Sequence, residues 1–166
     1  MCVMQTACTC FMRGFIHMYA DTITLFNRYS SKLGDMWLPT VITGADLNTD
    51  RAAVVAKYGE SSADKATLHI RYEVEDGAPY VAGKRYLSPK AWEAQTNDQL
   101  ADTLTFTPGQ DFDFFWAGAW PGTEPINDED YPEGFYAHMN RKHDGVYAIT
   151  NAAMYSVIPH FEIGGK

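Results

Sequence analysis

Hydrophobic and polar positions alternate with a period of two in several short stretches of this chain. The clearest stretch is "TLHIRYEV" at residues 67–74, where every second side chain is apolar: Leu68, Ile70, Tyr72 and Val74. Such alternation is typical of a half-buried β-strand. Residues 22–29 and 36–44 show the same kind of pattern with turn-forming residues between them, so we expect a hairpin whose Pro39 occupies an edge or a bulge.

Further strands are expected along the rest of the chain. The Asp-Gly turn in "EDGAPY" predicts that residues 80–87 pair with residues 67–74, and residues 102–109 and 111–118 are also β-like. Residues 51–59 favour a strand, although so short an apolar run does not exclude a helix.

The last segment predicts one strand ending near Thr150, a turn at residues 151–153 and then a long final strand. That strand would contain a bulge or an edge at Pro159 and carry one apolar face, formed by Tyr155, Val157, Phe161 and Ile163. The closing "GGK" would then be a stub that solvent or a neighbouring subunit can reach.

Two short helices complete the prediction. Ser88 is a suitable N-cap before Pro89, which fits the first helical position, and residues 133–145 form the second helical pattern. Short strands separated by turns favour a mainly β fold, either an antiparallel β barrel or a sandwich, with one or two short helices.

The length of 166 residues suits one domain. We expect a single β-rich domain at residues 18–166, preceded at residues 1–17 by an N-terminal extension or a misassigned start. All three cysteines lie in that first segment, so no disulfide or thiol chemistry is expected in the domain: Cys2, Cys8 and Cys10.

The net charge of -8 and the absence of a Lys/Arg cluster argue against wholesale binding to nucleic acid or to an anionic membrane. No stretch reaches the roughly 20 apolar residues that a membrane-spanning helix needs. We therefore expect no membrane association and a protein that is intracellular when made.

Candidate chemistry is sparse. No serine lies in a strand-turn-helix elbow, and His138 and His143, five residues apart beside Asp144, do not share a helical face that would bind a metal. His69 lies on the polar face of its strand. We expect no catalytic residue, no metal and no cofactor; the alternative is a small hydrolase using His160 and Glu162 with carboxylates of the acidic loop.

Two segments are candidate contact surfaces. The aromatic stretch around residues 114–120 divides between core and partner contacts, with about half of its large side chains expected in the core: Phe114, Phe115, Trp116 and Trp120. The acidic loop contains Asp128, Glu129 and Asp130 and reads as a solvated surface. A further alternative is a carbohydrate- or protein-binding module in which Trp116 and Trp120 stack on a ligand.

Several longer motifs carry a resemblance: "YADTITLFNRY", "LHIRY", "YLSPKAWEAQTND", "INDEDY" and "IPHFEIGGK". Over residues 18–166 the chain resembles minor capsid or head-tail connector proteins of tailed phages and prophages of Gram-positive bacteria. More distantly it resembles stopper proteins, which are small β barrels that complete the phage head.

This resemblance implies a non-enzymatic virion structural protein that forms a ring at the head-tail junction. Its expected partners are the portal or adaptor and the tail proteins, and DNA would pass through the ring without specific binding. The expected location is the virion, and the bacterial host cytoplasm during assembly. Contacts would involve the aromatic stretch at 114–120 and the acidic loop at 128–130.

Overall fold

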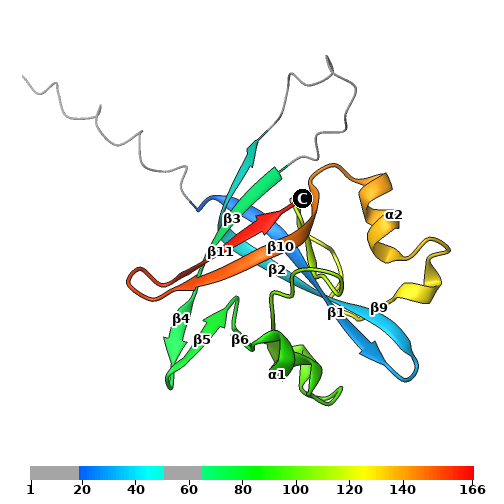
Figure 1. Ribbon diagram of the computed structural model, residues 1–166, viewed down its shortest axis with the longest axis horizontal. Coiled ribbons are helices and arrows are strands. Elements are labelled where there is room, and N and C mark those ends of the chain that lie inside the picture. The colour runs from blue at the N-terminus through cyan, green and yellow to red at the C-terminus, as the bar shows by residue number, and fades with distance from the viewer. Residues whose placement is uncertain (1–18, 51–64) are drawn as a thin grey trace, which may run out of the picture.

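Two long strands at the start of the domain form the predicted hairpin. The computed structural model describes residues 19–50 and 65–166, and in it β1 (Asp21–Ser31) pairs along its whole length with β2 (Gly34–Asp50) (Figure 1). Pro39 is buried in a part of β2 that pairs with β1 alone, as expected for a residue without an N–H donor.

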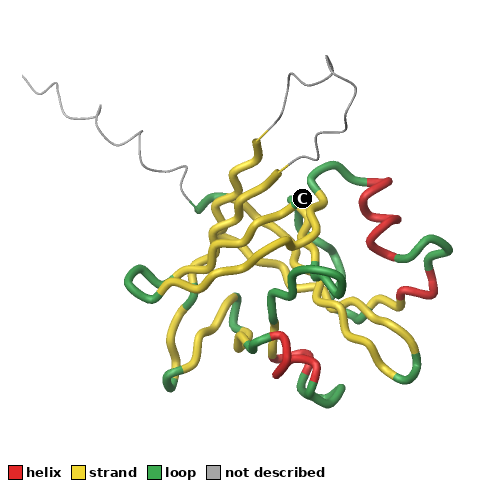
Figure 2. The backbone as a smooth tube through the Cα atoms, in the orientation of Figure 1, coloured by secondary structure: helices red, strands yellow, loops and turns green. Residues whose placement is uncertain are grey.

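Six strands close into an antiparallel barrel. β3 (Lys65–Arg71) pairs with β2 and β11 (His160–Gly165), and β11 pairs with β10 (Val146–Tyr155). The short β8 (Phe114–Trp116) joins β10 to β1, so the sheet returns to the β1–β2 pair. The mainly antiparallel β fold is thus confirmed, as a barrel rather than a sandwich (Figure 2).

A small second sheet contains β4 (Glu73–Glu75), β5 (Ala78–Val81), β6 (Lys84–Tyr86) and β7 (Thr103–Leu104). The Asp-Gly hairpin is confirmed, but the strand predicted at 67–74 is interrupted at the buried Tyr72, and Val74 is 60% exposed. The strand predicted at 80–87 is divided by a turn at Ala82 and Gly83, where both φ angles are positive. Of the strands predicted at 102–109 and 111–118, only β7 and β8 form.

The final hairpin differs from its prediction. β10 continues through residues 151–153, where a turn was predicted, and the turn lies instead at residues 156–159. The prediction of a long final strand containing Pro159 is therefore wrong. A bulge between Ile149 and Asn151 shifts the register of β10 against β11, and the Asn151 side-chain oxygen accepts a hydrogen bond from Gly164 N (2.8 Å). Pro159 suits the turn because it has no N–H to donate.

The glycines of the closing "GGK" are packed within β11 and do not form an accessible stub. A Cβ atom on Gly165 would lie 2.8 Å from Phe115 Cζ and 2.8 Å from Tyr147 Cβ. Lys166 continues the pairing, since its backbone N–H and C=O both bond to Ala148. The small size of glycine is therefore what lets β11 approach the barrel interior here.

The helices are α1 (Pro89–Glu93) and α2 (Phe135–Lys142), with 3-10 turns η2 (Leu100–Asp102) and η3 (Asp128–Asp130). The two-residue β9 (Ile126–Asn127) pairs antiparallel with β2. Ser88 precedes α1 as predicted, although its side chain makes no capping bond. α2 is shorter than the predicted 133–145 because Gly134, with φ of +85°, precedes it and His143 is extended.

Side chains bury into two main clusters. One fills the barrel and includes Ile23, Leu25, Leu68 and Ile163. The second is largely aromatic and lies outside the barrel, where Phe26 and Phe114 contact Phe135 of α2. Alternate residues of β1 therefore bury on both of its faces.

In the described part of the chain, none of the helices has the length and apolar character needed to cross a bilayer.

Residues 51–59, for which a strand was favoured, and the three cysteines lie outside the described residues.

Candidate functional site

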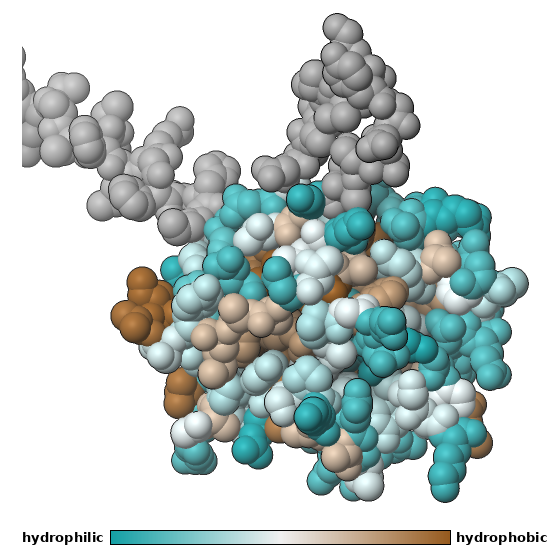
Figure 3. Space-filling view, viewed as in Figure 1, coloured by the Kyte–Doolittle hydropathy of each residue, from teal (hydrophilic) through white to brown (hydrophobic). Residues whose placement is uncertain are grey.

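Two hairpin tips carry the most exposed large hydrophobic side chains. At the β10–β11 turn Val157 is 97% and Ile158 69% exposed, and at the β1–β2 turn Leu33 is 90% exposed. Figure 1 shows these two turns on opposite sides of the molecule. In Figure 3 strongly apolar atoms protrude at the position of the β10–β11 turn. We define Leu33, Val157 and Ile158 as the apolar tips.

The β10–β11 tip lies at the end of an arm, which we define as residues 151–155 of β10 and their partners in β11. Further contacts support this arm. Tyr72 donates a hydrogen bond through its hydroxyl to Tyr155 O (2.9 Å), and the Tyr155 ring stacks on His160 with centroids 4.9 Å apart. His160 Nδ1 also contacts Ile158 O at 2.7 Å. These contacts hold the arm while leaving the two aliphatic side chains in solvent. Two adjacent exposed apolar side chains, such as Val157 and Ile158, indicate a contact surface more strongly than a single exposed side chain such as Leu33 does.

The sequence placed Val157 on a strand face and therefore missed the tip. Ser156 and Pro159, which flank the two aliphatic residues, are ordinary turn residues and were the available signal.

The aromatic stretch divides between core and surface. Phe114 and Phe115 are fully buried, and the Phe114 ring stacks on Phe26 at 4.7 Å, so a partner cannot reach these two residues in this fold. Trp116 and Trp120 are partly exposed. Their rings lie 6.5 Å apart at 83°, which provides no flat pair of rings for a sugar.

Asp128 in the acidic loop supports the fold. Its Oδ1 accepts hydrogen bonds from Trp37 Nε1 (2.7 Å) and from Phe135 N (2.9 Å) at the start of α2. Sequence reasoning missed this role because the cap comes from seven residues before the helix, with no cap residue adjacent to it. Glu129 and Asp130 are exposed, so these two of the three predicted contact residues in the acidic loop are accessible to a partner.

His160 and Glu162 do share one face of β11, but the acidic loop is not their neighbour. Glu162 Oε2 lies 3.9 Å from His69 Nε2, and His69 Nδ1 lies 3.5 Å from Asp46 Oδ2, so His69 sits between two carboxylates on adjacent strands. Figure 1 shows β9, beside the acidic loop, on the opposite side from the β10–β11 turn. The predicted hydrolase grouping is therefore not assembled.

Metal binding finds no support among the described residues, where no group of three or more His, Cys, Asp or Glu side chains is arranged to hold an ion. His138 packs against Tyr131 and His143 against Trp116, which are ring contacts rather than a shared ligand set.

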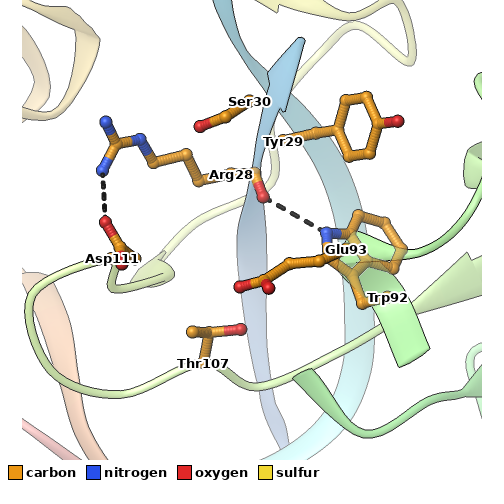
Figure 4. Close-up of a pocket in the computed structure, with 7 residues that line it drawn as sticks. All are labelled: Arg28, Tyr29, Ser30, Trp92, Glu93, Thr107 and Asp111. Atoms are coloured by element: carbon orange, nitrogen blue, oxygen red, sulfur yellow. Dashed lines mark hydrogen bonds and ion pairs between the residues drawn. The ribbon is translucent and has the colours of Figure 1, made fainter. Parts of the chain in front are cut away.

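A small pocket of about 240 Å³ lies between β1 and α1 (Figure 4). Its only cation, Arg28, is 3.6 Å from Asp111 and also bonds to Asp35, whose pKa is lowered mainly by that hydrogen bond. Trp92 Nε1 donates to Arg28 O (3.2 Å) and so ties α1 to β1. Because two carboxylates already balance the guanidinium, the pocket has no uncompensated positive charge to attract an anion.

Asp113 is the buried carboxylate of the fold, with 1% of its surface exposed. Its oxygens accept hydrogen bonds from Arg28 N, Thr107 N and Asn27 Nδ2 at 2.7–2.9 Å. Desolvation raises its pKa to about 7 despite these donors. The group joins β1 to the loop before β8 through these hydrogen bonds, which indicates a structural role.

A family model described as "Family of unknown function (DUF6751)" matches residues 18–166. No curated protein matches the chain, and no solved structure does.

Proposed function

This chain belongs to DUF6751, a family of unknown function. From its resemblance to minor capsid and head-tail connector proteins, we propose that it is a structural protein of the phage virion. It acts at the head-tail junction as a connector or head-completion subunit and forms a ring. The structural observation that supports assembly into a ring is the pair of apolar tips on opposite sides of one barrel.

Ring assembly requires two different contact surfaces on each subunit. In a closed ring each subunit meets its neighbours head to tail, so one surface must fit another that lies elsewhere on the same chain. The β1–β2 tip with Leu33 and the β10–β11 tip with Val157 and Ile158 provide apolar side chains on two such sides. Burying a Val or Ile side chain contributes about 1.5–3 kcal/mol each, which favours their being covered in an assembly.

The remaining partners follow from the expected place in the particle. Portal or adaptor proteins would lie above the ring and tail proteins below it, with Trp116, Glu129 and Asp130 as candidate contacts. A net charge of -8 would repel DNA phosphates, so DNA passes through the ring without specific binding. The protein would be found in the virion, and in the host cytoplasm during assembly.

The first experiment is electron microscopy of lysates from a phage with a stop codon in this gene. Separate tails together with DNA-free heads are expected, and normal virions would overturn the proposal.

The second experiment tests the tip within the same phage. We expect the pair Val157→Asp and Ile158→Asp to reproduce the defect, because charge at the tip prevents its burial. Val74→Asp is the matched control, since Val74 is similarly exposed but lies in the small sheet. Intact particles with the tip variant would show that the tip is not an assembly contact.

A further inference from the structure

In the part of the chain that the structure describes, the outer half of β10 has an unpaired edge. Residues 146–148 of β10 pair with β8 on one side, whereas beyond Ile149 β11 is the only described strand that pairs with β10. Among the described strands none covers the other edge of residues 151–155. These residues are exposed, and Met154 and Tyr155 are 54% and 46% accessible. A strand edge of this kind presents backbone N–H and C=O groups to whatever strand can reach it.

This edge lacks the usual protection against pairing. Natural edge strands are blunted by Lys, by Pro or by inward charges, yet residues 145–159 contain no Asp, Glu, Lys, Arg or His, which is the longest such stretch in the chain. Pro159 lies in the turn, beyond the strand. The bulge near Asn151 lies at the base of the arm and leaves residues 152–155 regular.

The charge distribution allows a second copy of the chain to be the occupant. Two copies with a net charge of -8 each repel one another over most of their surfaces, but an uncharged edge lets them approach. Antiparallel pairing about a two-fold axis at Ala153 would place Ala153 opposite its counterpart and Ala152 opposite Met154. No like charges would then face each other across the ladder.

We propose that a second copy of this chain pairs through the same edge, strand β10 against strand β10, in an antiparallel two-fold contact. This inference goes beyond the proposed function, because the contact is isologous and is distinct from the head-to-tail contacts of a ring. It is a property of the isolated protein and needs no phage component.

The test uses the full chain with Ala153→Lys and with Ala153→Glu, measured by sedimentation velocity over a range of concentrations. Wild type is expected to form dimers. Each variant alone should dimerise at least tenfold more weakly, because like charges would meet at the axis. An equimolar mixture should regain dimers, because Lys then faces Glu. Ala119→Lys and Ala119→Glu are the controls, since Ala119 is exposed in the loop after β8.

The outcomes separate the alternatives. Wild type that stays monomeric at every concentration, or variants that associate like wild type, would overturn the proposal. Loss of association that mixing fails to restore would also overturn it, because β10 would then pair with a different surface. Circular dichroism confirms that each variant is folded. Hydrogen exchange of wild type offers an independent check, as those amides of residues 152–154 that point to the unpaired edge should gain protection with concentration.

Discussion

At the scale of single residues, two positions are tightly constrained. Asp113 is a buried carboxyl group, and Gly165 lies where a side chain would not fit. Asp113 accepts hydrogen bonds from three N–H donors: Asn27 Nδ2 and Arg28 N of β1, and Thr107 N. Gly165 fills the narrow space between Phe115 and Tyr147. Neither role is visible in the sequence, because each depends on residues brought together from distant positions.

Asp113 should make stability depend on pH. Its pKa rises from 3.8 to about 7 on folding, so the folded state binds a proton that the unfolded state releases. Its stabilising contribution is complete below pH 3.8 and is lost as the pH rises to about 7. Relative to Asp113→Asn, wild type should lose about 1.4 kcal/mol per pH unit across this window. Urea unfolding of both proteins measures the difference, and parallel pH profiles would contradict it.

Gly165→Ala should destabilise the barrel by about 1–3 kcal/mol, because the new Cβ would overlap Phe115 and Tyr147 in a closely packed interior. Gly122→Ala is the control, since its Cβ would come no nearer than 3.5 Å to another atom and should change stability by less than about 0.5 kcal/mol. Thermal unfolding compares the two. Equal melting temperatures for both variants and wild type would show that β11 can shift to accommodate the added Cβ atom without loss of stability.

At the scale of elements, α2 depends on a side chain that is remote in sequence. Gly134 precedes the helix without offering a side-chain cap, so Asp128 supplies the acceptor for Phe135 N and also holds the Trp37 indole. A carboxylate beside the first turn of a helix is favoured by the helix dipole as well.

Asp128→Ala should cost about 1–3 kcal/mol, because it leaves two part-buried donors without their acceptor. Asp128→Asn keeps an oxygen in place and should cost less. Denaturant unfolding followed by tryptophan fluorescence checks both variants. Asp130→Ala is the control for removing a charge from the same turn, and an equal loss in that variant would point to loop charge rather than capping.

Elements were predictable where local sequence decides them. The β1–β2 hairpin, the Asp-Gly turn and the Ser88–Pro89 helix start follow from short-range preferences and are present. The last hairpin was misplaced because Asn151 resembles a turn residue, whereas in the fold it occupies a bulge. The apolar tip was consequently assigned to a strand, and its exposure could not be foreseen from alternation alone.

At the scale of the whole molecule, the fold class followed from the spacing of strands and turns, but barrel closure did not. Closure depends on β8, whose three residues bridge β1 and β10. Its sequence is an aromatic cluster that could belong to the core or to a contact surface, and only the tertiary packing decides which rings are buried. The two-sided burial of β1 has the same origin, since α2 covers the face that a simple alternation would leave to solvent.

That three-residue closure also has a kinetic consequence. The two long hairpins join neighbouring strands and can form within microseconds, but β8 must find β1, where Phe114 pairs with Phe26 from far along the chain. Each such distant pairing requires a large loop to close before any contact compensates its lost entropy. Refolding should therefore be slow for a chain of this size, on the order of milliseconds to seconds. The pairing of β8 with β1 and β10, which closes the barrel, would limit its rate.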